Sequence, residues 1–308
     1  MSQAAGAGPR GGDAVDSATE AFSDNPRQAA GADPVRDDAL AGSAPRGRAA
    51  APRAPRGGGL RRSVRLAWTI ATLVVVQAIV CGAAVLPVIA LWAPLLAWAA
   101  DSPVAGIAAV SFAAIPSYAV FAITLMFASA VATRATGWRT QPDANLRLAE
   151  LDWPLLDWVR YMVATHIVRL FAGTLFRGTP IWSAYLRLNG ARVGRRVYVN
   201  SLAVSDHNLL EFGDDVVIGG DVHLSGHTVE GGYVKTGRVC LRNHVTIGLG
   251  SVIGIGATIG PDVQVGALSL VPKHVTLDTR GVYVGVPARR LADRSEARAG
   301  APGAASGT

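Results

Sequence analysis

The sequence is poor in several residue types, and each shortage excludes a class of structure. Only two of the 308 residues are cysteines, which gives no disulfide framework and fits a reducing compartment. Residues 1–62 have almost no branched or aromatic side chains and consist mainly of Ala, Gly, Pro, Arg, Asp and Ser. This composition leaves little to bury and predicts a disordered tail. Acidic and basic residues are mixed within it, so we expect no nucleic-acid partner.

Charged residues are missing from two long stretches, residues 66–100 and 102–133. About 20 apolar residues cross a bilayer, so residues 63–133 are predicted to hold two transmembrane helices, near 66–90 and 106–131. Pro87 and Pro94 are expected to end or kink the first helix. The first stretch begins too far along the chain, and is too long, for a cleaved signal peptide.

Basic residues flank the two predicted spans. Three arginines precede the first span and two follow the second, whereas the short connection carries only Asp101. The distribution predicts a multi-pass protein of the cytoplasmic (inner) membrane, with both termini on the cytoplasmic side. The arginines are Arg61, Arg62, Arg65, Arg134 and Arg139.

Residues 134–190 are predicted to form a linker and an amphipathic helical segment. Residues 152–188 mix aromatic and aliphatic positions with four spaced arginines. This pattern is typical of a helix that lies at a membrane surface or against a neighbouring domain. His166 within it is expected to be an interfacial side chain.

A six-residue period runs through residues 191–290. It fits neither an amphipathic helix nor a hairpin array, but it fits a chain that turns a corner every six residues. Three such sides close one coil, and coils stack at about 4.8 Å, so the eleven repeats predict roughly four coils. A small or β-branched residue stands four positions after each bulky one and is expected on the inner wall. The bulky positions are Val193, Val199, Phe212, Ile218, Leu224, Leu241, Ile247, Ile253, Ile259, Val265 and Val271.

The closing stretch YVGVPARRL, residues 283–291, resembles the Gly-x-Pro-Ala ending of the hexapeptide-repeat acyltransferases. The resemblance implies an all-β, left-handed parallel β-helix over residues 191–290. The left hand comes from the resemblance, since ordinary parallel crossovers are right-handed. It also implies a homotrimer and an acyl-CoA donor such as acetyl-CoA, without a metal. Residues 291–308 are expected to be a second disordered tail.

A narrower resemblance covers about residues 150–290. The stretches GTPIWSAYLRLNGARVGRRV, SDHNLLEFGDDVVIG and HTVEGGYVKTGRV are similar to the membrane-associated C-terminal region of polylysine-synthetase-like nonribosomal peptide synthetases. The central motif of that family runs His-x-x-Glu-Asp-Arg, two further residues, then Lys. His227, Glu230 and Lys235 match it, whereas Gly231 and Gly232 replace the acid and the arginine.

Two interruptions disturb the period, near residues 205–211 and 230–239. Loops held by a rigid scaffold commonly carry function, and histidines gather here. His207 lies in the first interruption and His227 immediately precedes the second. Because Leu224 and Leu241 are 17 residues apart, about one coil, we expect His227 and His244 to stack on neighbouring coils.

His227 is the predicted general base, since imidazole titrates near working pH. It would remove a proton from an acceptor hydroxyl or amine, which then attacks a thioester. Glu230 is predicted to orient the ring. The predicted substrate contacts are Lys235, Asp206, His207, Arg289 and Arg290, of which the two arginines would meet the phosphates of the donor.

Two alternatives to acyl transfer remain open at this point. Zinc bound by His223, His227 and His244 would resemble the γ-carbonic anhydrases, which share the β-helix and bind zinc through three histidines. A non-catalytic scaffold for a membrane biosynthetic complex is the other. The leading prediction is a membrane-anchored acyltransferase that moves an acyl or aminoacyl group to a small-molecule or membrane-bound acceptor, with a synthetase as partner.

Overall fold

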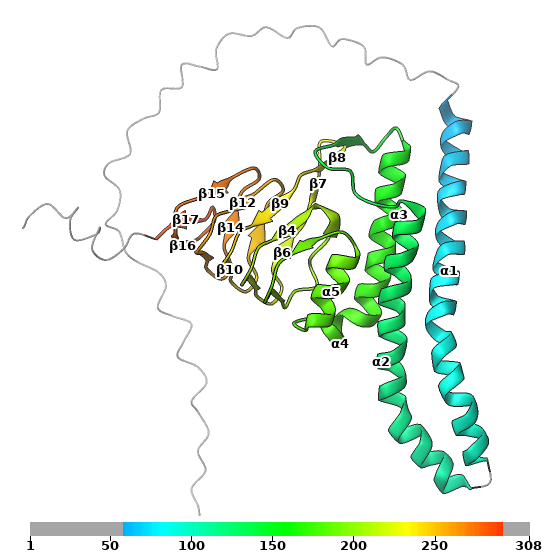
Figure 1. Ribbon diagram of the computed structural model, residues 1–308. Helices are drawn as coiled ribbons and strands as arrows, with labels where there is room; N and C mark the ends of the chain where they lie inside the picture. The colour runs from blue at the N-terminus through cyan, green and yellow to red at the C-terminus, as the bar shows by residue number, and fades with distance from the viewer. Residues whose placement is uncertain (1–57, 101, 292–308) are drawn as a thin grey trace, which may run out of the picture. The chain divides into compact units, whose positions relative to one another are not determined.

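The computed structural model describes residues 58–100 and 102–291 (Figure 1). Nearly all of both predicted tails, and Asp101, lie outside the described residues. The first five described residues already belong to a helix, so the predicted tail and the first helix overlap at residues 58–62.

Two long helices open the described chain, α1 (Gly58–Ala99) and α2 (Pro103–Thr136). By length and composition, both are able to cross a membrane. Neither Pro87 nor Pro94 ends α1, which runs on to Ala99. Ser102 caps α2, because its Oγ accepts from the Ala105 N–H at 3.4 Å, and Gly137 ends it in the left-handed region with φ 73°.

The segment that follows contains several short elements rather than one amphipathic helix. They are β1 (Asn145–Arg147), α3 (Trp153–Val168), a π-helical turn (Arg169–Gly173), α4 (Thr174–Phe176) and α5 (Pro180–Leu188). Thr179 starts α5 by accepting from the Trp182 N–H, with Pro180 in the first turn. One apolar core extends from α1 and α2 through α5 into the strands beyond.

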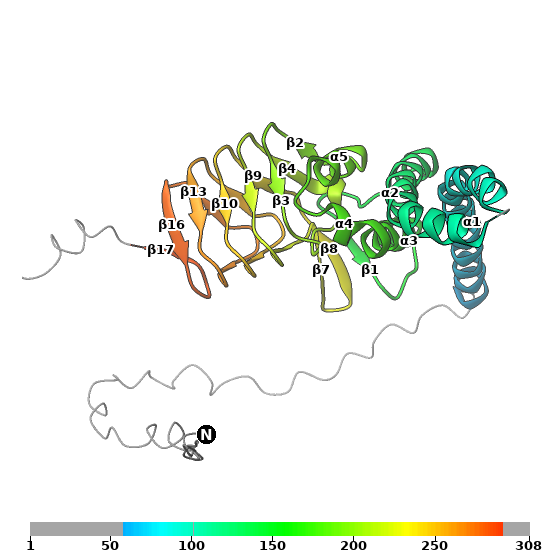
Figure 2. The ribbon, with the colours of Figure 1, turned by 90° about the horizontal axis from the view of Figure 1, so that it is seen from below.

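Residues 192–290, here called the coiled region, form three parallel sheets (Figure 2). The first contains β2 (Arg192–Val193), β4 (Leu210–Phe212), β9 (Val239–Leu241), β12 (Thr258–Ile259) and β15 (Thr276–Leu277). The second contains β3 (Tyr198–Val199), β5 (Val217–Ile218), β10 (Thr246–Ile247), β13 (Val263–Val265) and β16 (Gly281–Val284), with β17 (Arg289–Arg290) antiparallel at its edge. The third contains β6 (His223–Leu224), β11 (Val252–Ile253) and β14 (Leu270–Val271).

From β10 onward the chain visits these sheets in rotation. Ile247 pairs with Val265, Ile253 with Val271 and Ile259 with Leu277, always 18 residues or three sixes apart. The bulky residue of each side points inward, and Ile253 is only 1% exposed. The period continues past the predicted last position, since Leu277 and Tyr283 are also buried.

The glycine after each bulky residue is explained by close stacking of the coils. A Cβ at Gly254 would lie 2.7 Å from the Lys273 nitrogen, and one at Gly248 would lie 2.4 Å from the Ala267 nitrogen. Neither glycine has a positive φ. These positions therefore require glycine because the backbone of the next coil approaches closely. Other residues adopt the backbone conformations that turn the corners.

The two interruptions of the period fold in opposite directions. The first turns inward as a short 3-10 helix, His207–Leu209, and its Asp206 and His207 are buried. The second leaves the coil as an antiparallel hairpin of β7 (His227–Glu230) and β8 (Tyr233–Thr236). β1 pairs with β8, so the helical part of the chain adds a third strand to this hairpin.

Gly231 and Gly232 form the turn of that hairpin, with φ of 58° and 82°. Positive φ at both central residues is the requirement of the two-residue turn that best fits a twisted hairpin. The two glycines therefore suit the turn that this hairpin makes.

The predicted stacking of His227 on His244 is wrong. Leu224 belongs to β6 and pairs with Ile253, whereas Leu241 belongs to β9 and pairs with Phe212 and Ile259. The 17-residue step from Leu224 to Leu241 is one side of a coil with a hairpin inserted, not a whole coil. The two leucines consequently lie in different sheets.

Candidate active site

His227 and Asp206 form a close pair of titratable side chains in the coiled region. Nδ1 of His227 lies 2.5 Å from Oδ2 of Asp206, whose side chain is completely buried, while 20% of the His227 side chain remains exposed. Asp206 has φ 53°, a backbone conformation that only a few per cent of non-glycine residues adopt. Seven other non-glycine residues of the described coiled region share this conformation, so the φ value does not by itself distinguish Asp206.

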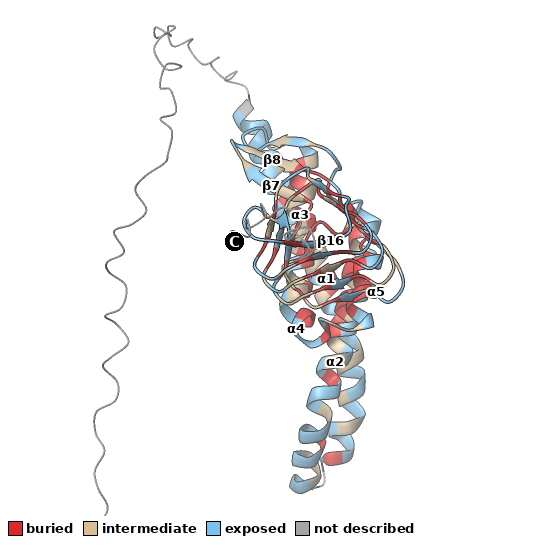
Figure 3. Ribbon diagram, turned by 90° about the vertical axis from the view of Figure 1, so that its left-hand side faces the viewer, coloured by how far each residue is buried: buried red, intermediate tan, exposed pale blue. Residues whose placement is uncertain are grey.

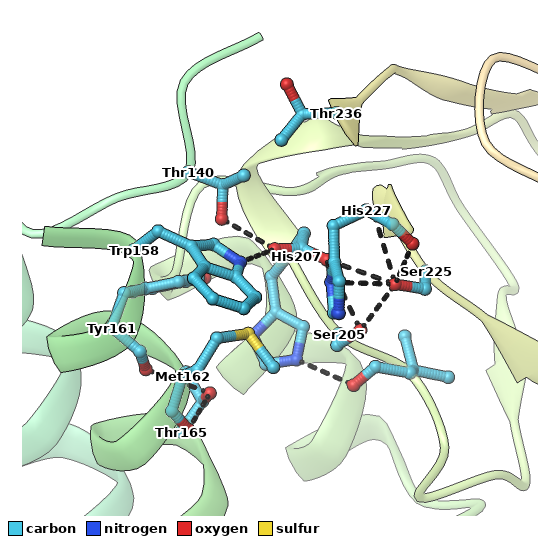
Figure 4. A network of polar contacts seen from close by, with 12 residues as sticks. Thr140, Trp158, Tyr161, Met162, Thr165, Ser205, His207, Ser225, His227 and Thr236 are labelled. Carbon is cyan, nitrogen blue, oxygen red and sulfur yellow. Dashed lines mark hydrogen bonds and ion pairs between the residues drawn. The ribbon is translucent and has the colours of Figure 1, made fainter. Parts of the chain in front are cut away.

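Two groups from outside the coiled region hold the other oxygen of this carboxylate. Thr140 donates its hydroxyl to Oδ1 of Asp206 at 2.6 Å, and Trp158 of α3 donates its indole N–H to the same atom at 3.2 Å. The Trp158 ring also packs edge-on against His227, with 5.0 Å between ring centroids. Figure 4 shows Thr140, Trp158 and His227 converging from the helical and coiled parts.

Two serines complete the hydrogen bonding of Asp206. Ser205 Oγ donates at 3.3 Å and Ser225 Oγ lies 3.2 Å from Oδ2. Ser225 Oγ also accepts the backbone N–H of His227 at 3.2 Å. The serines lie 3.0 Å apart, next to the bridge that joins Val204 to Leu224.

These contacts determine the protonation of the pair. Burial alone would raise the pKa of Asp206, but hydrogen bonds from His227, Thr140 and Ser225 bring that pKa below its usual value. An ionised Asp206 only accepts hydrogen bonds, so Nδ1 of His227 carries the proton. Nε2 is then the basic nitrogen, and it has no hydrogen-bond partner among the residues that the structure describes.

His227 borders a cavity of about 550 Å³ along the third sheet. Its walls come from β6, β7, β11 and β14, and they are mainly aliphatic, with Ile253, Ile255 and Leu270 among them. His223 and Lys273 add polar groups. The site thus combines a base, a buried carboxylate and an apolar channel of ligand size.

The residue that contacts the ring of His227 is Asp206, which corrects the prediction for Glu230. Glu230 instead pairs with Lys235 at 2.8 Å and with Lys273, and hydrogen bonds from these two lysines lower its pKa to about 2. Glu230 and Lys235 are both about 40% exposed. Together with Lys273 they connect the hairpin to the wall of the cavity.

His207, predicted as a substrate contact, lies in the core. Only 2% of it is exposed, and its ring packs edge-on against Tyr161 and Tyr185. Burial lowers its pKa to about 4. Its Nε2 lies 3.3 Å from the Val204 carbonyl, and Nδ1 has no hydrogen-bond partner among the described residues. A neutral, enclosed ring cannot contact a substrate.

The predicted zinc ligands do not come together. His223 borders the cavity with His227, but His244 sits at a corner of the coil with φ 57°, between Asp215 and Asp262. Within residues 58–100 and 102–291, no group of three or more His, Cys, Asp or Glu side chains is arranged to hold a metal ion.

Arg289 and Arg290 lie on β17, at the last coil, where they pair with Val284 and Tyr283. Both are exposed. The cavity that His227 borders is lined by other residues, so contact of the two arginines with a donor remains a prediction.

Sequence reasoning missed Thr140, Trp158, Ser205 and Ser225. Thr140 and Trp158 are 66 and 48 residues from Asp206, and nothing in their own neighbourhood marks them. The serines offered a weak signal, because both stand immediately after the residues that bridge neighbouring coils.

Among known proteins, the chain is similar only to solved structures, and those named below have low sequence identity to it. No family model matches the chain, and no curated protein matches it. Similar solved structures include a hexapeptide-repeat acetyltransferase from Vibrio cholerae complexed with acetyl coenzyme A, at 20% identity over 36% of this chain and 74% of that one, with a TM-score of 0.28. A galactoside acetyltransferase with coenzyme A has 24% identity over 42% and 82%, with a TM-score of 0.31. A maltose O-acetyltransferase from Clostridium difficile has 18% identity over 43% and 86%, also with 0.31. TM-scores this low do not establish a common fold or activity.

Proposed function

We propose that this protein is a membrane-anchored acyltransferase in which His227 is the general base. The observation that carries the proposal is the 2.5 Å contact between Nδ1 of His227 and the buried Asp206, with the ring at the edge of the apolar cavity. A base of this kind needs its proton on one nitrogen and its lone pair toward the substrate. The Asp206 carboxylate supplies both conditions.

The reaction follows from that arrangement. Nε2 of His227 takes the proton of an acceptor hydroxyl or amine, and the acceptor oxygen or nitrogen forms a bond to the thioester carbonyl carbon. The carbon–sulfur bond of the tetrahedral intermediate then breaks, and the departing thiolate receives the proton from Nε2. Asp206 stabilises the imidazolium while it holds the proton, and Trp158 keeps the ring in place.

We assign the donor to the thioester class, with acetyl-CoA as its simplest member. An extended pantetheine-like chain fits the aliphatic wall formed by Ile253, Ile255 and Leu270. The three-sided rotation of the strands and the closing residues 283–291 support classification as a left-handed, hexapeptide-repeat β-helix. The resemblance further suggests a homotrimer, in which a neighbouring subunit would complete each site.

Attachment to the inner membrane by α1 and α2 is part of the proposal. Both helices have exposed apolar side chains, with Leu86 of α1 65% and Phe112 of α2 83% exposed. Much of the ribbon of α2 is coloured as exposed in Figure 3. Leu170, Phe171 and Leu175 add exposed apolar side chains at the π-helical turn, and Phe171 contacts Phe121 of α2. A membrane surface at that level would accept these side chains. The flanking arginines favour the cytoplasmic side for the coiled region.

An acceptor that resides in the membrane, or a partner synthetase located there, would explain the anchor. The match of His227, Glu230 and Lys235 to the synthetase-associated motif favours an aminoacyl group as the group transferred to the hydroxyl or amine acceptor. Lys273 lines the cavity and shares Glu230 with Lys235, so the three side chains together keep one positive charge, which suits an anionic group on either substrate.

The proposal is tested on detergent-purified full-length protein of defined oligomeric state. Calorimetry should show saturable binding of acetyl-CoA near one site per chain, and an acceptor screen should show release of free thiol. His227→Ala should keep donor binding and lose thiol release. Full turnover by this variant, or a well-folded wild type that binds no thioester donor, would remove the assigned mechanism. A stoichiometric zinc that survives dialysis would favour the hydrolyase alternative.

A further inference from the structure

A second cavity, of about 690 Å³, lies where α2 ends. Its walls come from the end of α2, the following segment, α3, the α5–β2 connection and the first interruption. It shares no lining residue with the cavity that His227 borders. Four arginines line it, which are Arg134, Arg139, Arg192 and Arg238.

The positive charge in this cavity is largely uncompensated. Arg192 and Arg238 both donate to the same oxygen of Glu211, at 3.0 and 3.2 Å, so a single carboxylate serves two guanidinium groups. Arg134 donates to the carbonyl of Arg187. Among the residues that the structure describes, no acidic side chain lines the cavity. The four arginines of the cavity are therefore offset by a single carboxylate, that of Glu211.

Arg139 is the most informative of the four. Among the described residues it has no hydrogen bond and no ion pair. Its neighbours in sequence, Trp138 and Thr140, are both buried and fix the backbone on either side of it. Arg139 is exposed and lines the cavity, so its five donors are open to solvent and available to a ligand.

Concave sites lined by one sign of charge concentrate counter-ions, because low-dielectric walls focus the field. Guanidinium groups match phosphate oxygens through paired N–H donors. A cavity of about 690 Å³ admits one or two phosphates with a small attached group. We propose that this cavity binds a phosphate-bearing ligand, separate from the thioester donor.

The ligand has two possible sources with this same chemistry. Arg134 directly follows the uncharged stretch of residues 102–133 and lies in the last turn of α2, so the phosphate of a lipid headgroup is one source. A free phosphate or diphosphate compound is the other. The experiment distinguishes the two by giving the protein each form separately.

Calorimetry on full-length protein in a neutral detergent uses inorganic pyrophosphate in one arm and short-chain phosphatidic acid in the other, with short-chain phosphatidylcholine as the blank. We expect saturable binding in at least one arm. Pyrophosphate binding alone identifies a free ligand, and phosphatidic acid binding alone identifies a lipid. Arg139→Gln should weaken that binding about tenfold, as expected for the loss of one charge-assisted contact.

Arg242→Gln is the matched control, since it removes one exposed positive charge outside the cavity and should leave the affinity unchanged. The proposal is overturned if neither probe binds above the blank. It is also overturned if the double variant Arg139→Gln, Arg238→Gln binds the probe with the affinity of the wild type. If pyrophosphate competes with coenzyme A, and Arg139→Gln does not change that competition, the phosphate binds at the donor site instead. Acetyl-CoA binding measured in parallel keeps failure of the proposed function separate from failure of this site.

Discussion

The two interruptions of the six-residue period look alike in sequence and differ completely in burial. The first places Asp206 out of contact with water, whereas the second carries Glu230 into the solvent, 40% exposed, on a hairpin. The first is covered by Thr140 and Trp158, which arrive from the helical part. The side chains packed over an interruption therefore decide whether its carboxylate is buried and can orient a general base.

The comparison matters because a carboxylate acts differently in the two settings. Buried and hydrogen-bonded on both oxygens, Asp206 is fixed in position and interacts strongly with the His227 ring. Glu230, between two half-exposed lysines, is screened by water. The site therefore depends on the inward interruption, and the outward one shapes its mouth.

Asp206→Asn should have the largest effect. An amide removes the negative charge and can bind the wrong tautomer of His227, so kcat for thioester turnover should fall on the order of a thousandfold. The Michaelis constant for the donor should change little, because Asp206 is fully buried. Glu230→Gln, the outward counterpart, should stay within about threefold in kcat. Equal losses in the two variants would erase the distinction drawn between the interruptions.

A pH dependence of stability should follow from His207, the other buried group of the first interruption. Its pKa is about 4 in the folded protein and about 6.5 in an unfolded chain. Between these two pH values the His207 ring is protonated in the unfolded state but not in the folded state. The free energy of unfolding is therefore highest above pH 6.5 and falls as the pH drops to 4. The loss amounts to about 3 kcal/mol.

Unfolding of detergent-solubilised protein at pH 7, 5.5 and 4.5 measures this loss. His207→Phe keeps an aromatic ring between Tyr161 and Tyr185 and should flatten the profile over that range. A profile of unchanged steepness in the variant would assign the acid sensitivity to other groups.

The smallest predicted effects distinguish the coil from the hairpin. Gly254→Ala forces a methyl group against the backbone of the next coil, 2.7 Å from the Lys273 nitrogen, and should cost about 2 kcal/mol. Gly231→Ala meets open space and only a positive φ, so it should cost about 1 kcal/mol. Melting temperatures of the two variants compare these costs directly. A larger loss for Gly231→Ala would mean that the hairpin contributes more to stability than the coil.

Much of the coiled region was predictable because its period is a direct consequence of packing. Each inward position recurs at the same step, and the spacing of Ile247, Ile253 and Ile259 is enough to deduce which strands pair. The inserted hairpin was not predictable in the same way, since its length imitates a whole coil. That coincidence produced the wrong pairing of His227 with His244.

His227 stood out in sequence because a register break and a family motif meet there. The role of Asp206 did not, because several acidic residues lie within reach along the chain and only the fold selects one of them. Burial by Thr140 and Trp158 depends on contacts across 66 and 48 residues. Patterns with short periods carry no information about such contacts.

The contacts of Thr140 and Trp158 with Asp206 also bear on how this protein can be shortened. A fragment that starts at the first coil would look like a complete soluble domain, yet its key carboxylate would lose two of its donors and gain access to water. The boundary between the helical part and the coiled region in the sequence is therefore not a boundary in the candidate site. Any soluble version must keep residues 138–188, with a new polar surface where α1 and α2 were removed. By the same reasoning, a shortening that also removed residues 138–188 would have to be accompanied by a replacement for those two donors.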